Sequence, residues 1–176
     1  ATRGRGLDKA APGSRWPGLT HLPAVLAGVF FLLFAAQLWL HARNASATMD
    51  EPVHLLAGYR HLQCGDYAFN PEHPPLLKQV AAAPLQRMQL RMPEALPCAA
   101  GFTPKAETFR LADLFLAENG GDRILMPARA MAMLFSLLLA VLVGLAGWRM
   151  FGRWTAVAAM ALFAMEPVLV AHGSLV

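Results

Sequence analysis

The chain has 176 residues, of which 56% are hydrophobic and only 15% are charged, and its mean hydropathy is +0.41. A soluble domain carries about 25% charged residues, so this composition excludes an ordinary soluble protein and indicates an integral membrane protein. The net charge of +4 does not point to nucleic acid, because the basic residues are scattered and form no stripe or stacking platform.

The first apolar segment predicts a transmembrane helix over residues 21–41, preceded by a basic cytoplasmic tail over residues 1–20. The run is nearly unbroken and long enough to cross about 30 Å of hydrocarbon. A cleaved signal peptide is the alternative, since Ala45-Ser46-Ala47 resembles a cleavage site. We favour an uncleaved anchor because the run exceeds a normal signal-peptide core and further spans follow.

The next 82 residues predict a structured extracytoplasmic loop, residues 42–123. Apolar side chains recur there at helical spacing, proline stands at two helix starts, and glycine marks two helix ends. Such helices would lie in the membrane interface with their apolar sides toward lipid or the spans. We predict three amphipathic interfacial helices, at about residues 51–64, 75–88 and 107–118.

Two further spans are predicted, over residues 124–148 and 154–173, joined by a short turn over residues 149–153. Arg149 and Arg153 lie in that turn, which is therefore expected on the cytoplasmic side. The sequence stops in mid-pattern after residue 176, so we expect the N-terminal part of a larger protein. The expected fold class is an all-α polytopic membrane protein.

Asp50 and Glu51 directly follow the first span and precede Pro52. A carboxylate at a helix N-terminus is favoured by the helix dipole, so the pair can be a simple cap. The functional interpretation is a general base that removes a proton from an acceptor hydroxyl. Its place beside the membrane, where a lipid-borne substrate presents its headgroup, favours that interpretation.

Lys78 and Arg129 are the two cations of interest. Lys78 follows Pro74-Pro75 in the first turn of a predicted helix, where a cation opposes the helix dipole. Helix N-termini with a nearby cation bind phosphate, but a lysine snorkelling along an interfacial helix explains the pattern equally well. Arg129 lies near the outer end of the second span and can reach the headgroup region or clamp a lipid phosphate.

Four further residues are candidates for supporting roles: His54, His73, Glu166 and His172. Glu166 lies within the third predicted span, and an intramembrane carboxylate is costly enough to be a functional candidate or a hydrogen-bonded structural group. The six histidines make no metal-ligand pattern, so we predict no metal site. Whether a divalent metal takes part in the chemistry of Asp50 and Glu51 stays open.

Cys64 and Cys98 both fall in the predicted outer loop, where disulfides persist. A bridge between them and two free thiols are both compatible with the sequence. Asn44-Ala45-Ser46 is a glycosylation sequon close to the membrane, relevant only in a eukaryote.

Two motifs together resemble a known family. Asp50-Glu51 after the first span, followed by Gly65-Asp66-Tyr67 and by His73-Pro74-Pro75-Leu76 with Lys78, resembles the protein O-mannosyltransferases of glycosyltransferase family 39. It also resembles their bacterial relatives, the phospholipid-carrier-dependent glycosyltransferases of the GT-C superfamily. Leu77 stands where the mannosyltransferases usually have glycine. The resemblance covers roughly residues 20 to 176.

The resemblance implies a GT-C-like fold of many transmembrane helices with interfacial helices in the first outer loop. It implies an inverting transfer of sugar from a polyprenyl-phosphate carrier to an acceptor hydroxyl. We expect a bacterial inner membrane as the location and no further cofactor. Asp50 would be the base, Glu51 would assist it, and Lys78 and Arg129 would stabilise the departing phosphate. The expected partners are the lipid carrier, an acceptor protein, lipid or glycan, and the C-terminal remainder of the protein.

A non-catalytic transporter or scaffold segment is the alternative, in which Asp50 and Lys78 merely cap and snorkel. A weaker third option is a truncated pseudo-enzyme that binds carrier lipid without turnover. The glycosyltransferase hypothesis predicts that Asp50, Lys78 and Arg129 converge on one cavity. A transporter should instead show broken helices and polar groups near the membrane midplane, for which Glu166-Pro167 is the sequence signal.

Overall fold

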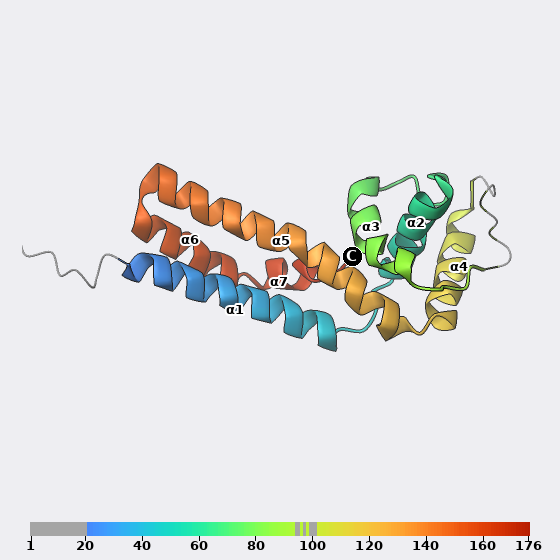
Figure 1. Cartoon of the computed structure of the whole chain (residues 1–176), viewed down its shortest axis with the longest axis horizontal. Helices are drawn as coiled ribbons and strands as arrows, with labels where there is room; N and C mark the ends of the chain where they lie inside the picture. Colours follow the sequence, from blue (N-terminus) through green and yellow to red (C-terminus); the bar gives the residue numbers. More distant parts are fainter. Residues whose placement is uncertain (1–20, 94–95, 97, 99–101) are drawn as a thin grey trace, which may run out of the picture.

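The computed structural model describes residues 21–93, 96, 98 and 102–176, and every regular element in this part of the chain is a helix. The prediction of an all-α protein is thus confirmed. The expected basic tail, residues 1–20, lies outside the described residues. Long apolar helices occupy one end of the molecule and a cap of shorter helices the other (Figure 1).

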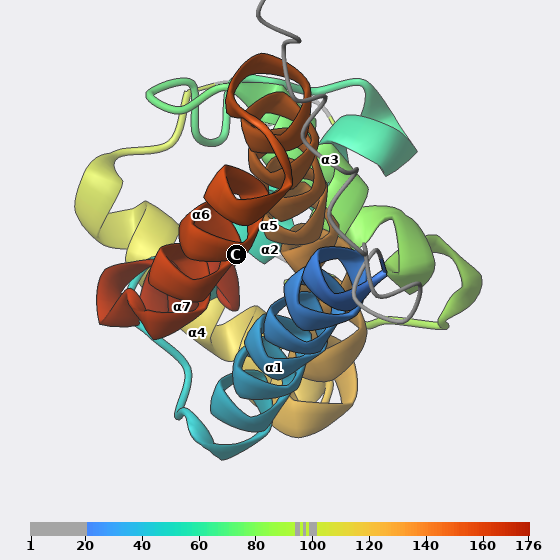
Figure 2. The same cartoon turned by 90° about the vertical axis from the view of Figure 1, so that its left-hand side faces the viewer.

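Two helices are long and apolar enough to cross a membrane: α1 (Leu22–Asn44) and α5 (Gly121–Phe151). A third span is present if the bent pair α6 (Arg153–Met165) and α7 (Pro167–Gly173) is counted as one. These helices lie side by side, and Figure 2 views them from the end at which α1 begins. Phe34, Leu38 and Met160 are among the buried side chains that hold them together.

The third span differs from the expected single helix over residues 154–173. It breaks at Glu166, whose backbone is extended, and α7 leaves α6 at an angle of 65°. The cause is Pro167, because proline has no backbone N–H and disfavours helical geometry in the residue before it. The Glu166 side chain accepts a hydrogen bond from the Val168 amide at 3.2 Å and so caps α7.

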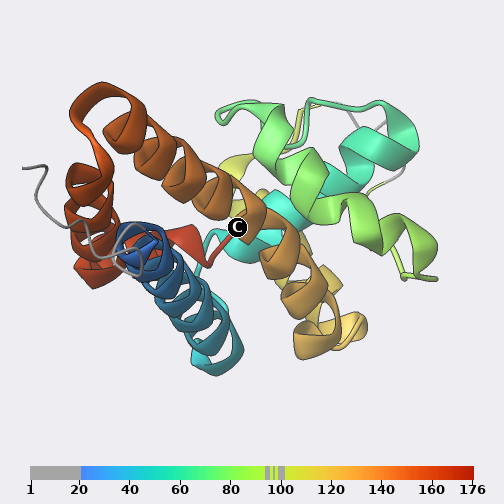
Figure 3. The same cartoon turned by 60° about the vertical axis from the view of Figure 1, so that its left-hand side comes forward.

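The cap contains α2 (Glu51–Cys64), α3 (Pro75–Ala82), a 3-10 turn η2 (Ala83–Arg87) and α4 (Lys105–Glu118). The second helix was expected to run to residue 88, but its α-helical part ends at Ala82 because Pro84 cannot donate to the turn before it. The first turns of α5 reach into this cap and pack against α3 and α4, so the cap and the spans are continuous (Figure 3). Buried apolar residues that join them include Leu56, Tyr59, Leu85, Phe115 and Ile124.

The cap is also cross-linked by a disulfide between Cys64, the last residue of α2, and Cys98, with Cα atoms 5.3 Å apart. Of the two alternatives that the sequence leaves open, the structure therefore has the bridge. Gly65 follows Cys64 with φ of 64°, a left-handed conformation that ends α2 and favours glycine.

Gly58 allows α2 and α3 to approach each other. A Cβ atom at this position would lie 2.1 Å from the main-chain oxygen of Lys78. We expect Gly58→Ala to lower the free energy of unfolding by at least about 1–3 kcal/mol, because α3 must move away. Thermal denaturation in detergent measures the change. Gly28→Ala on α1 is the matched control, since nothing lies within 4 Å of its Cβ position, and equal behaviour of the two variants would contradict the prediction.

Candidate functional site

The site lies where the first turn of α2 meets the loop that precedes α3. A cleft of about 160 Å³ opens there, and both sequence motifs contribute to its walls. The α2 segment supplies Asp50, Val53 and His54, and the loop supplies residues 69–73. The opposite wall comes from α4 and the chain before it, including Phe102, Lys105 and Phe109. The structure thus brings together residues that lie twenty or more positions apart.

Asp50 stands at this cleft as an exposed carboxylate. It occupies the position before α2, but its side chain makes no capping hydrogen bond to the helix. Among the described residues, the Asp50 carboxylate therefore has no capping role that would explain its presence. A carboxylate that is exposed and not used by the helix is available to a substrate.

Glu51, the adjacent carboxylate, is fully buried and belongs to a different environment. Arg129 Nε donates to Glu51 Oε1 at 2.8 Å, and Arg129 Nη2 donates to Glu51 Oε2 at 2.6 Å. The amides of Thr48 and Val176 also donate to Glu51, at 3.0 and 3.3 Å. Burial by itself would raise the pKa of Glu51, but the hydrogen bonds and charge of Arg129, with those two amides, hold that pKa below its ordinary value.

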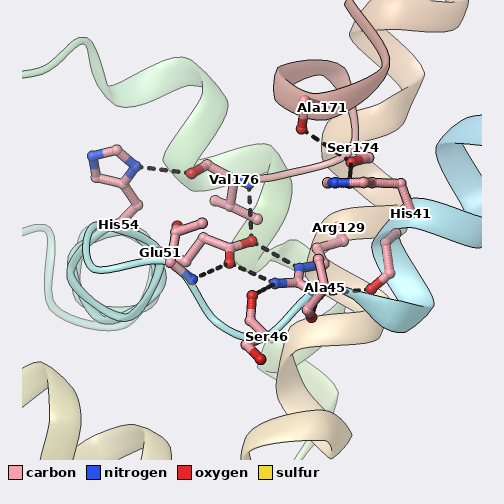
Figure 4. A network of polar contacts seen from close by, with 11 residues as sticks. His41, Ala45, Ser46, Glu51, His54, Arg129, Ala171, Ser174 and Val176 are labelled. Atoms are coloured by element: carbon pink, nitrogen blue, oxygen red, sulfur yellow. Dashed lines mark hydrogen bonds and ion pairs between the residues drawn. The ribbon is translucent and has the colours of Figure 1, made fainter. Parts of the chain in front are cut away.

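Arg129 uses all its donors inside the protein (Figure 4). Besides Glu51, it donates to the main-chain oxygens of Ala42, Ala45 and Ser46, at 2.6, 2.8 and 2.9 Å. A guanidinium has five N–H groups, and these contacts account for all of them. The ion pair of Arg129 with Glu51 therefore joins α5 to α2, and the bonds to Ala42, Ala45 and Ser46 add the end of α1. Together these contacts fix the turn that leads into Asp50.

Lys78 is also buried, and its ammonium organises the loop that forms the cleft. It donates to the main-chain oxygens of Asn70 and His73, at 2.7 and 3.0 Å, and to the side-chain oxygen of Asn70. An ammonium has three N–H groups, so these contacts satisfy it. Burial lowers the pKa of Lys78, against the opposing charge of Glu72.

The expected convergence of three residues on one cavity is therefore not what the structure shows. Asp50 lines the cleft, whereas Lys78 and Arg129 lie behind its walls and have no N–H left for a phosphate oxygen in this conformation. The sequence pattern left phosphate binding and snorkelling open for these cations, and only the family resemblance implied phosphate. The carbonyl oxygens that surround both groups have no local sequence signal. A phosphate-binding role for them stays a prediction, and it requires that they exchange partners.

His54 and His73 both line the cleft, with ring centroids 5.2 Å apart and planes at 70°. His54 Nδ1 lies 3.1 Å from the main-chain oxygen of Val176. Burial lowers the pKa of His54, against a raising effect of the Val176 oxygen, and the charges of Lys78 and His73 lower it further. Both histidines are thus part of the site.

Residues 173–176 connect the site to the bent third span (Figure 4). Ser174 is fully buried, and its Oγ lies 2.7 Å from His41 Nδ1 on α1. Ser136 on α5 donates to the main-chain oxygen of Gly173 at 3.1 Å. This anchoring is what places the backbone of Val176 against Glu51 and His54.

Glu166 and His172 lie away from the cleft, beside the α6–α7 bend. Glu166 borders a cavity of about 300 Å³ together with Gln37 and His41, and His172 borders another of about 280 Å³ beside Ser136. The structure therefore separates these two candidates from Asp50. Among the described residues there is no group of three or more His, Cys, Asp or Glu side chains that could hold a metal ion.

Three contributors to the site were not singled out from the sequence: Asn70, Lys105 and Phe102. Asn70-Pro71 reads as a turn, and only the structure shows that the Asn70 amide oxygen receives Lys78. Lys105 and Phe102 reach the cleft through tertiary packing of α4, for which no local signal exists.

Comparisons with protein families, characterised proteins and solved structures give no match for this chain, so its function is argued from these residues.

Proposed function

We propose that this chain belongs to an inverting membrane glycosyltransferase that moves a sugar from a polyprenyl-phosphate carrier to an acceptor hydroxyl. The observation that carries the proposal is the exposed Asp50 carboxylate at a cleft lined by both motifs. Such a carboxylate can accept the proton of an acceptor hydroxyl as it attacks the sugar carbon. The leaving group is the lipid phosphate, which departs with the bonding electron pair.

The buried residues around Asp50 support it by fixing its position. The Glu51–Arg129 pair holds the turn between α1 and α2, and Lys78 holds the loop across the cleft. Misplacing a reacting group by 1 Å can cost about 10²-fold in rate, so such positioning matters for catalysis. In this proposal Glu51, Arg129 and Lys78 are positioning residues, and Lys105 is a cation that already faces the cleft.

The arrangement of apolar and polar parts suits a carrier lipid. The cap lies at one end of the long apolar helices (Figure 1) and supplies the residues that line the cleft, so a headgroup at the membrane surface would meet Asp50. We place the N-terminus on the cytoplasmic side and the cleft outside, in a bacterial inner membrane, and we propose a polytopic GT-C-like fold. The acceptor is a protein, lipid or glycan hydroxyl.

Sugar transfer from polyprenyl-phosphate donors tests the proposal, in membranes that carry the full-length protein. Asparagine keeps the shape of Asp50 but cannot accept a proton, so we expect Asp50→Asn to lower the transfer rate by about 10²–10⁴-fold. Asp113→Asn, on an exposed position of α4 outside the cleft, is the matched control and should keep the wild-type rate. Equal activity of all three proteins would remove Asp50 as the base.

A non-catalytic transporter or scaffold segment is the second candidate, and the bent third span is the observation that favours it. A helix break within a candidate span, with Gln37, His41 and Glu166 around one cavity, is the type of feature that transporters use. A wild-type protein that transfers no sugar from any polyprenyl-phosphate donor would favour this candidate. Sugar transfer that depends on Asp50 would exclude it.

A further inference from the structure

The ring of His54 is held in one chemical form by its contact with Val176. The main-chain oxygen of Val176 can only accept a hydrogen bond, so Nδ1 of His54, 3.1 Å away, must carry a proton and donate. In the neutral ring the other nitrogen, Nε2, then carries a lone pair and acts as the base. Figure 4 shows that Nε2 points away from Val176 and Glu51.

His54 also stands next to Asp50 on the same face of α2. The two residues are four positions apart, and the His54 amide donates to the Asp50 main-chain oxygen at 3.0 Å, which is helical geometry. Side chains at this spacing lie one above the other on a helix. Both residues line the cleft, so a carboxylate and an imidazole border the same space.

We propose that Asp50 and His54 form a proton relay, in which Asp50 takes the proton of the acceptor hydroxyl and passes it to Nε2 of His54. The relay rests on the proposed glycosyltransferase function and assigns His54 as its second proton-carrying group. An imidazole is intrinsically a stronger base than a carboxylate, so the transfer regenerates the Asp50 carboxylate.

The relay balances without any further reactant. The hydroxyl O–H bond breaks as the bond from that oxygen to the sugar carbon forms. The bond between the sugar carbon and the phosphate oxygen breaks, and its electron pair leaves with the lipid phosphate. That phosphate becomes a monoester whose second pKa is about 6, so it can take the proton from His54 and carry it out of the site.

Burial favours the return of His54 to the neutral form, because it lowers the pKa of the ring. The groups that face it are Asp50 at the start of α2, Glu72 and His73 in the loop, Lys78 on α3, Lys105 on α4 and the Val176 oxygen. Burial and the charges of Lys78 and His73 lower the pKa of His54 below 6.5, although the Val176 oxygen and the charge of Asp50 act in the opposite direction. The ring is therefore neutral at pH 7 and loses its accepting lone pair only as the pH falls through that lowered pKa.

Two substitutions separate a proton-carrying role from a purely structural one. In His54→Asn the amide nitrogen takes the place of Nδ1 and can still donate to Val176, but no group replaces Nε2. In His54→Gln an amide reaches the place of Nε2 but cannot take up a proton. We expect both variants to transfer sugar about 10²-fold more slowly than the wild type, and to lose the fall in rate that the wild type shows as His54 becomes protonated.

The outcomes separate the relay from the proposed function. Wild-type transfer that requires Asp50 but not His54 would overturn the relay alone, as would full recovery by His54→Gln or an unchanged pH profile in His54→Asn. A wild type that transfers no sugar would overturn both.

Nitrogen NMR of histidine-labelled full-length protein provides a readout besides activity. The signals missing from His54→Asn belong to His54, and at pH 7 they should show a protonated Nδ1 and a bare Nε2. The opposite tautomer would overturn the relay.

Discussion

Replacing Arg129 with methionine is expected to lower the free energy of unfolding by about 3–5 kcal/mol. The substitution removes the partner of a fully buried carboxylate and also leaves the oxygens of Ala42, Ala45 and Ser46 without their donor. A buried charge without a partner is far more costly than a pair that is absent altogether. Thermal denaturation in detergent, with hydrogen exchange of α2, would measure the loss.

A matched control is available on the surface of the same protein. Arg110 and Glu107 form an ion pair on α4 in which both side chains are exposed, so Arg110→Met should leave stability unchanged. Substituting Glu51→Gln together with Arg129→Met should recover part of the stability, because no buried charge then remains. If Arg129→Met behaves like Arg110→Met, the pair is not a determinant of the fold.

The pH dependence of stability provides a further check on the same pair. The pKa of Glu51 is held below its ordinary 4.5 in the folded protein. Its contribution is therefore fully present above about pH 4.5 and is lost as the pH falls through the lower folded pKa. Glu51→Gln should lack this particular acid-dependent loss. A wild type and a Glu51→Gln variant with the same acid dependence would contradict the assignment.

The helices could be predicted where their signals are local. Pro52 and Gly65 mark the two ends of α2, and the structure has that helix over Glu51–Cys64. The apolar run of α1 likewise predicts a membrane-length helix.

Pro84 and Pro167 are equally local signals. The expected helix over residues 75–88 and the expected single span over residues 154–173 both run through a proline, and the structure ends or bends the helix there. Glu166-Pro167 enters the sequence-based predictions only as the signal of the transporter alternative.

The environment of each charged residue could not be predicted, because it depends on partners far away in the sequence. Glu51 and Arg129 are 78 positions apart, and nothing near either residue indicates the other. Asp50 and Glu51 are neighbours with the same chemistry, yet one is exposed at a cleft and the other is fully buried. The sequence pointed to segments that line a cleft in the structure, but it could not divide their residues between exposed and buried environments.

Breaking the disulfide is the second change with a large expected effect on stability. The bond closes a loop with a sequence separation of 34 residues, for which chain entropy gives a stabilisation of about 4 kcal/mol. Arg60, which is fully buried, donates to the Leu96 oxygen at 2.9 Å and anchors the same segment from inside. The chain before α4 should therefore loosen when the bond is reduced, and with it the wall of the cleft that contains Phe102 and Lys105.

Reduction of the intact protein tests this without a mutation, because the sequence has only two cysteines. The cap should unfold at a lower temperature after reduction, and hydrogen exchange should quicken in α2 and α4 before it changes in α1. Serine substitution of both cysteines should reproduce the effect, whereas an unchanged melting temperature would contradict it. Structural disulfides persist in oxidising compartments. Labelling of whole cells with a thiol reagent therefore tests the location of the cap. Labelling of the two cysteines only after a reductant is added would support an outward-facing cap.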